Sequence, residues 1–163
     1  MTKIFAHRGA SAYAPENTME AFELAAKQGA DGIELDVHVT KDGEVVVTHD
    51  EKIDRVSNGS GFIKDMTLRE LKRLSFHNHM ESYVGAGIPT LREVLEYVST
   101  TNMDVNIELK TGIYWYPQIE EKPAFIVQET GMHDRVIYSS FNHHSIAKIK
   151  EIDSTAEPAW LFS

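Results

Sequence analysis

Short apolar runs of the kind that form β-strands alternate with amphipathic helical segments along most of this chain of 163 residues. Strands are predicted at 3–7, 32–39, 44–49, 103–109, 135–140 and 159–162. The longer helices are predicted between them, at 17–28, 90–98, 123–130 and 145–152. A helical crossover is what joins two parallel strands, because the chain must return to the edge from which it started. The sequence therefore predicts an α/β fold with a mostly parallel sheet.

The ends of the predicted helices carry capping signals. Asn17 is the predicted N-cap of the first helix, and Gly29 ends that helix. Threonine followed three residues later by glutamate occurs at 67–70 and at 90–93, which is the pattern of a capping box. The stretch from 51 to 88 is otherwise less regular than the rest of the chain.

The chain is acidic, with 25 Asp and Glu against 16 Lys and Arg and a net charge of −9. Nucleic acids and anionic membrane surfaces bind basic faces, so neither is an expected partner. The absence of cysteine excludes disulfides, thiolate metal sites and cysteine nucleophiles. We find neither a leader peptide nor an apolar run of about 18 residues. We therefore expect a cytoplasmic protein that does not insert into a membrane.

Three carboxylates lie in predicted apolar strands: Glu34 and Asp36 in the segment 32–39, and Glu108 in the segment 103–109. Like charges on neighbouring strands repel one another unless a cation joins them. Carboxylate oxygens are hard ligands, which favour Mg²⁺ or Ca²⁺. The alternative is a set of solvated residues on the wet face of an antiparallel sheet. The same residue type in two apolar strands favours the metal site.

His7 and His49 end the first and third predicted strands. The Asp-Gly pair in the turn 40–43 predicts a hairpin after the second strand. A two-residue loop would pair His49 with Asp36, and a four-residue loop would pair it with Glu34. Either register places His49 on the carboxylate face of the sheet. Because an imidazole titrates near neutral pH, both histidines are candidates for general acid and base.

The remaining histidines are interpreted as structural or surface residues: His38, His77, His79, His133, His143 and His144. Of these, His38 shares a strand face with Glu34 and Asp36. The histidines at 77–79 and at 143–144 lack the i, i+4 spacing of a zinc site on a helix.

Arg8 and Lys110 are the candidate phosphate contacts, the first as a planar fork and the second as a point charge. Gly9 would let a ligand approach the backbone closely. The aromatic stretch 114–116 is either a wall of a substrate pocket or a packed lid. Two imidazoles, three carboxylates and two cations together suit metal-assisted cleavage of a phosphodiester. The sequence has no Gly-x-Ser-x-Gly elbow, which argues against a serine hydrolase.

The chain resembles the glycerophosphodiester phosphodiesterase family in an ordered series of short motifs. They are His7-Arg8-Gly9, Pro15-Glu16-Asn17-Thr18, Glu34-Leu35-Asp36-Val37, Lys41-Asp42-Gly43, His49-Asp50, Ile88-Pro89-Thr90-Leu91 and Glu108-Leu109-Lys110. Each motif is weak by itself, but their order and spacing make the series specific.

This resemblance implies a TIM-type (β/α)8 barrel with its site at the C-terminal ends of the strands. The roles that it implies are metal binding, acid–base catalysis and phosphate contact. The residues for metal binding are Glu34, Asp36 and Glu108. Those for acid–base catalysis are His7 and His49, and those for phosphate contact are Arg8 and Lys110. The implied reaction releases glycerol 3-phosphate and an alcohol from a glycerophosphodiester, with one Mg²⁺ or Ca²⁺ ion as cofactor.

The resemblance also bears on domain organisation. It implies one barrel domain over 1–163, with a small inserted subdomain at about 51–88 that shapes access of the headgroup. A complete barrel takes about 250 residues, so we expect a barrel truncated after about six strands. A homo-oligomer could complete such an open barrel.

Two alternative functions stay open at this point. The first is a phospholipase D-like or phosphoinositide phospholipase C-like enzyme, which shares the paired histidines and the acidic metal site but acts on lipids with tails. The second is an inactive truncated barrel that acts only through oligomerisation.

Overall fold

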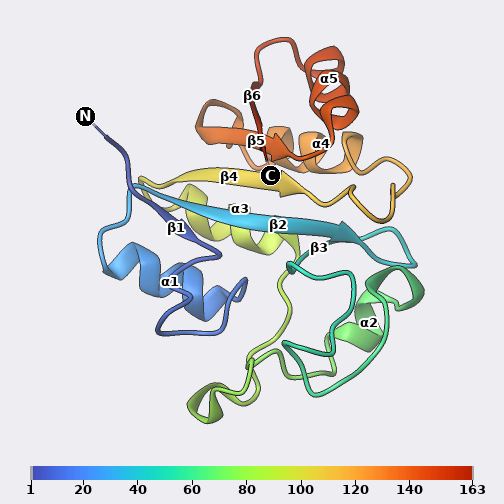
Figure 1. Ribbon diagram of the computed structural model, residues 1–163. Coiled ribbons are helices and arrows are strands. Elements are labelled where there is room, and N and C mark those ends of the chain that lie inside the picture. Colours follow the sequence, from blue (N-terminus) through green and yellow to red (C-terminus); the bar gives the residue numbers. More distant parts are fainter. Residues whose placement is uncertain (1, 163) are drawn as a thin grey trace.

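The computed structural model describes residues 2–162, which form one sheet of six strands (Figure 1). The strands are β1 (Phe5–His7), β2 (Gly32–Val39), β3 (Val45–Val47), β4 (Asp104–Leu109), β5 (Val136–Ser140) and β6 (Glu157–Trp160). Five of them run parallel in the order β1-β2-β4-β5-β6, and β3 pairs antiparallel with β2 outside this row. The predicted number of strands and the predicted hairpin after the second strand are confirmed, and the hairpin leaves β3 outside the parallel row.

Helices connect the successive strands of the parallel row. They are α1 (Met19–Lys27), α3 (Leu91–Ser99), α4 (Glu121–Glu129) and α5 (His143–Ile152). Between β3 and α3 lie the short helix α2 (Leu68–Leu71) and the 3₁₀ turns η1 (Ile63–Asp65) and η2 (Glu81–Tyr83), and η3 (His133–Arg135) precedes β5. Thr67 and Thr90 form both of the predicted capping boxes. Within residues 2–162, each helix is too short or too polar to cross a membrane.

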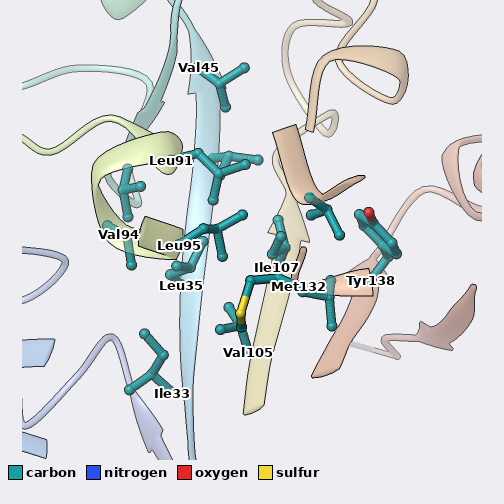
Figure 2. Close-up of a cluster of buried hydrophobic side chains, with 14 of the residues drawn as sticks. Ile33, Leu35, Val45, Leu91, Val94, Leu95, Val105, Ile107, Met132 and Tyr138 are labelled. Carbon is teal, nitrogen blue, oxygen red and sulfur yellow. The ribbon is translucent and has the colours of Figure 1, made fainter. Parts of the chain in front are cut away.

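One face of the parallel row packs against the connecting helices (Figure 2). Ile33 and Leu35 of β2 belong to the same apolar cluster as Leu91 of α3, and all three are fully buried. Burying a side chain of this size contributes about 1.5–3 kcal/mol. Because successive residues of a strand point to opposite faces, this packing turns Glu34 and Asp36 to the face away from the helices.

The segment between β3 and α3 has an apolar cluster of its own. It consists of Val46, Ile53, Val56, Ile63, Leu71, Phe76 and Ile88. Val46 belongs to β3 and forms a β-bridge with Thr90 at the start of α3, so the cluster is attached to the sheet at this point. The assignment of 51–88 as an inserted subdomain stays a prediction.

The N-cap of the first helix lies one residue later than predicted. Its N-cap is Thr18, whose Oγ1 accepts a hydrogen bond from the amide of Ala21 at 3.3 Å. Asn17 instead adopts a left-handed backbone conformation with φ of 56°, which asparagine tolerates better than most residues. The prediction of Asn17 as the cap was therefore wrong. Gly29, with φ of 79°, follows the last turn of the helix as predicted.

The hairpin between β2 and β3 has a three-residue loop. The amide of Thr40 donates to the carbonyl of Glu44 at 2.9 Å, and Val37 pairs with Val47. Gly43 has φ of 86°, the left-handed conformation with which three-residue hairpin loops commonly close. The structure thus contains neither of the two loop lengths that the sequence suggested.

The odd loop length moves the strand register by one residue. The amide of Thr48 donates to the carbonyl of Asp36 at 3.0 Å, so His49 is opposite neither Asp36 nor Glu34. The predicted pairing of His49 was therefore wrong. Because β3 ends before His49, contacts other than the strand ladder must place this histidine.

Gly9 lies where the loop after β1 crosses α1. It has φ of 78°, and a Cβ at this position would lie 2.8 Å from the backbone of Ala21. We expect Gly9→Ala to lower the free energy of unfolding by about 2–5 kcal/mol, because backbone strain and overpacking add. Gly29→Ala is the matched control: its φ is 79° with nothing within 4 Å, so we expect only the strain of about 1–2 kcal/mol. Urea unfolding measures both, and equal losses would contradict the close packing at Gly9.

Candidate active site

The register of the parallel row brings four predicted site residues together. His7 of β1 pairs with Glu34 of β2, and Asp36 of β2 pairs with Glu108 of β4. Residues that pair across a sheet share a face, so all four lie on the face away from the helices. Glu34, Asp36 and Glu108 each offer one carboxylate oxygen, and these three atoms lie within 4.8 Å of one another. We call these three residues the carboxylate cluster.

Two cations contact the carboxylate cluster. Lys110 Nζ lies 2.7 Å from Glu108 Oε1 and 3.1 Å from Asp36 Oδ1. Arg8 Nε lies 3.5 Å from Asp36 Oδ2, and the Arg8 amide donates to Glu34 Oε2 at 3.0 Å. Burial alone would lower the pKa of Lys110, but the charges of Asp36 and Glu108 raise it above its usual value. Lys110 is therefore protonated and holds two of the three carboxylates together.

The carboxylate cluster remains short of positive charge. Burial raises the pKa of Glu34 to about 7, and the neighbouring charge of Asp36 adds to this effect. Asp36 is 1% exposed, and its Oδ1 has no hydrogen-bond donor, although the ion pair with Lys110 compensates part of its charge. A buried carboxylate oxygen without a donor is costly unless a cation accompanies it. Because all three ligand atoms are carboxylate oxygens, the cluster fits a hard divalent ion such as Mg²⁺ or Ca²⁺.

In the metal-free protein we expect the Glu34 carboxyl group to titrate with a pKa of about 7 instead of the ordinary 4.5. Between these two values the folded protein keeps a proton that the unfolded chain has lost. The contribution of Glu34 to the free energy of unfolding therefore falls as the pH rises from 4.5 to about 7, and it changes no further above that pH. Carbon-13 NMR of the carboxyl groups measures the midpoint, which added Mg²⁺ should lower. A midpoint near 4.5 in the metal-free protein would contradict the shortage of positive charge around Glu34.

Asn17 contacts the carboxylate cluster, although its place in the sequence predicted a capping role. Its Nδ2 donates to Asp36 Oδ2 at 2.9 Å, and both side chains are buried. Its left-handed backbone is compatible with this contact and leaves the capping role to Thr18. The available signal was the presence of two adjacent residues of cap type, of which only one can cap the helix.

A second polar network connects Arg8 with His49. Arg8 Nη1 donates to Glu16 at 3.0 Å, and Arg55 donates to the two oxygens of Glu16 at 2.7 and 2.9 Å. Arg55 Nε also donates to Asp50 Oδ2 at 2.7 Å, and Asp50 Oδ1 lies 2.6 Å from His49 Nδ1. Burial alone would raise the pKa of Asp50, but hydrogen bonds from Arg55 and His49 lower it to about 2. Ionised Asp50 can only accept, so Nδ1 of His49 carries a proton and directs reactivity to Nε2.

The two predicted catalytic histidines have different surroundings. The side chain of His7 is 70% exposed, and its Nε2 lies 3.8 Å from Glu34 Oε2. The side chain of His49 is partly exposed and lies against Asp50. Neither ring is packed into the interior, so both are open to solvent and to a small ligand.

His38 is fully buried, and both of its ring nitrogens have partners. Its Nδ1 lies 2.8 Å from the hydroxyl of Tyr116, and its Nε2 lies 2.9 Å from the carbonyl oxygen of His49. Burial lowers the pKa of His38 and keeps the ring neutral at pH 7. Tyr116 is 5% exposed, whereas the adjacent Trp115 is 54% exposed. The aromatic stretch after β4 is therefore open to solvent at Trp115 and packed at Tyr116.

Comparison with known proteins identifies the family of this chain. The profile described as the glycerophosphoryl diester phosphodiesterase family matches residues 7–163. The chain belongs to this family. A glycerophosphodiester phosphodiesterase of Caldanaerobacter subterraneus subsp. tengcongensis is 51% identical over 152 residues, and one of Bacillus altitudinis is 52% identical over 149 residues. These alignments cover 93% and 90% of this chain but only 63% and 61% of the two relatives.

Solved structures of phosphodiesterases have the same fold. An Oleispira antarctica phosphodiesterase in complex with the product sn-glycerol-3-phosphate matches with a TM-score of 0.91 and 32% identity, covering 100% of this chain and 67% of that one. A glycerophosphodiester phosphodiesterase of Agrobacterium tumefaciens matches with a TM-score of 0.88 and 38% identity, covering 97% and 66%. The predicted α/β class of TIM-barrel type and the predicted family are thereby confirmed.

The phosphodiesterase motifs contain two residues of this polar network for which the sequence predicted no role. Glu16 lies in the second motif and contacts both Arg8 and Arg55. Asp50 follows His49 directly, and an acid beside a candidate catalytic histidine was an available signal. Arg55 lies outside the motifs in an irregular segment, where no sequence pattern marked it.

Proposed function

We propose that this chain carries the site of a metal-dependent hydrolase that converts glycerophosphodiesters to glycerol 3-phosphate and an alcohol. Membership of the family supports the class of reaction. The Oleispira antarctica relative, which was solved with sn-glycerol-3-phosphate as its product, supports the nature of the product. The single observation that carries the proposal is the carboxylate cluster, which lies beside His7 and in contact with Arg8 and Lys110.

Glu34, Asp36 and Glu108 would hold one divalent cation, Mg²⁺ or Ca²⁺. Such an ion, when bound, neutralises the charge that builds on the phosphate oxygens in the transition state. Two observations support this assignment: Asp36 Oδ1 is buried without a hydrogen bond, and the pKa of Glu34 is raised.

We assign the acid role to His49 and the base role to His7. The contact with Asp50 leaves Nε2 of His49 as the atom that can deliver a proton, and the Asp50 charge neutralises the imidazolium. This arrangement suits protonation of the leaving alkoxide. His7 is exposed next to Glu34 and would take the proton of the attacking group, a substrate hydroxyl or a water molecule.

Arg8 and Lys110 are assigned to the phosphate group. The ammonium group of Lys110 has three N–H donors, of which the contacts with Glu108 and Asp36 use at most two, so at least one N–H is free for a phosphate oxygen. Arg8 Nε makes no hydrogen bond and lies 3.5 Å from Asp36 Oδ2, so the guanidinium charge is held beside the carboxylate cluster, where it would attract an anionic ligand. Both side chains are held beside the carboxylate cluster before substrate arrives, which reduces the entropic cost of binding.

We also propose that the segment 51–88 shapes access of the headgroup, which its separate apolar cluster supports. A homo-oligomer and a cytoplasmic location stay predictions. Light scattering checks the first, and fractionation of cells checks the second.

Turnover of glycerophosphocholine with and without Mg²⁺ or Ca²⁺ tests the proposed function. Release of glycerol 3-phosphate only in the presence of the metal would support it. Preferential cleavage of intact phosphatidylinositol or sphingomyelin would favour the phospholipase-like alternative. No turnover of any of these substrates, together with a stable oligomer in light scattering, would favour the inactive barrel.

A further inference from the structure

His38 forms a polar connection between the loop after β4 and the backbone of His49. Its Nδ1 lies 2.8 Å from the Tyr116 hydroxyl and its Nε2 lies 2.9 Å from the His49 carbonyl oxygen. A carbonyl oxygen can only accept, so Nε2 carries the proton of the neutral ring. Nδ1 must then accept from the hydroxyl of Tyr116. Tyr116 therefore donates a hydrogen bond to His38, and His38 donates one to the backbone of His49.

The contact with His38 holds the chain where the strand ladder has ended. β3 ends at Val47, and the amide of Thr48 still bonds to β2. At the next residue, His38 Nε2 donates to the carbonyl of His49. Asp50 Oδ1 lies 2.6 Å from Nδ1 of the His49 ring. The first contact holds the backbone of His49 and the second holds its imidazole. Both are needed to give the ring one position, because a side chain can be oriented only from a backbone that is itself held.

Tyr116 is well suited to hold His38 because the two residues before it are anchored. Trp115 Nε1 donates to the buried carboxylate of Glu120 at 3.0 Å. Tyr114 packs edge-on against Phe62 of the segment 51–88, with 5.8 Å between the ring centroids. Tyr116 directly follows these two anchored residues and is almost fully buried.

We propose that Tyr116 and His38 are positioning residues for His49. Tyr116 holds His38 in the tautomer with a proton on Nε2, and His38 holds the backbone of His49 so that its ring stays against Asp50. This inference rests on the proposed function, in which His49 is the acid. It gives a role to a buried histidine and to the packed residue of an aromatic loop, neither of which touches the carboxylate cluster in the contacts described above.

Nitrogen-15 NMR of the imidazoles in the full chain tests the proposal without requiring turnover. In the wild type we expect His49 with its proton on Nδ1. In His38→Leu we expect the averaged signals of two tautomers, because the ring is no longer held against Asp50. His38→Gln should restore the wild-type signals, since its amide can both donate to the carbonyl and accept from Tyr116. Tyr138→Phe removes another buried tyrosine hydroxyl and is the control that should change nothing at His49.

Tyr116→Phe should shift the Nδ1 signal of His38 and give a smaller change of the same kind at His49. Unchanged His49 signals in folded His38→Leu would overturn the proposal. If His38→Leu does not fold, unchanged signals in Tyr116→Phe overturn it, and a shift that Tyr138→Phe does not share supports it.

Kinetics give a second readout of the same variants. We expect kcat to fall about 10–100-fold in His38→Leu, with KM within about threefold, because a misplaced acid slows the chemical step more than binding. His38→Gln should recover most of this loss, whereas an equal loss in His38→Gln would count against the hydrogen-bonded role. A wild-type chain without turnover would contradict the proposed function, while the NMR measurement would still decide on the positioning of His49.

Discussion

Replacement of Glu108 by glutamine is expected to weaken the binding of Mg²⁺ or Ca²⁺ by at least about 100-fold, because even groups that only orient metal ligands cost about 10–100-fold when removed. Glu108 supplies one of three carboxylate oxygens within 4.8 Å of one another. The amide keeps the size of the side chain and removes its charge, and Lys110 keeps its ion pair with Asp36. Isothermal titration calorimetry with each ion measures the loss, and metal-dependent turnover should fall with it.

Glu23→Gln is the matched control for this prediction. Glu23 is an exposed residue of α1, so its replacement removes the same charge without touching the carboxylate cluster. We expect its metal affinity to equal that of the wild type. A folded Glu108→Gln protein with wild-type affinity for both ions would rule out the carboxylate cluster as the metal site.

The strands and helices of the parallel row could be predicted because the signals that define them are local. The second strand extends over Gly32–Val39, the bounds that the sequence predicts. Its apolar residues alternate with polar ones, and the capping boxes at Thr67 and Thr90 use residues only three positions apart. Local signals of this kind agree with the global fold in well-folded sequences.

The register of the β2–β3 hairpin could not be predicted because contacts with a distant segment accompany it. The Asp42-Gly43 pair is compatible with loops of two, three or four residues. In the structure, Asp42 Oδ1 accepts hydrogen bonds from the Thr40 hydroxyl at 2.6 Å and from the amide of Leu68 at 3.0 Å. Leu68 is 26 residues further along the chain, so no pattern within the hairpin indicates this contact.

The carboxylate cluster could be predicted for a physical reason that does not extend to its neighbours. Carboxylates such as Asp36 and Glu108 in apolar strands are costly to bury, which makes them conspicuous in the sequence. Asn17 and Arg55 come from loops, where polar residues are ordinary and carry no such signal. Their contribution depends on backbone conformation, such as the φ of 56° at Asn17, which the sequence does not specify locally.

His49→Asn is expected to lower kcat about 10²–10⁴-fold on glycerophosphocholine, because the proposed acid is lost and an alkoxide leaves poorly without a proton. A p-nitrophenyl ester of glycerol 3-phosphate behaves differently, since its phenolate leaves without being protonated. On this aryl substrate we expect the same variant to keep most of the wild-type kcat. Steady-state kinetics on the two substrates, at the same pH and metal concentration, measure the difference.

His7→Asn is the matched variant, because a base that activates the attacking group is needed for both substrates. We expect it to lose activity on the alkyl and the aryl ester alike. Equal losses on the two substrates in His49→Asn would contradict the acid role, and a loss confined to glycerophosphocholine in His7→Asn would exchange the two assignments. The contact of His49 with ionised Asp50 favours a loss confined to glycerophosphocholine in His49→Asn, because the Asp50 charge stabilises the imidazolium whose Nε2–H would protonate the leaving alkoxide.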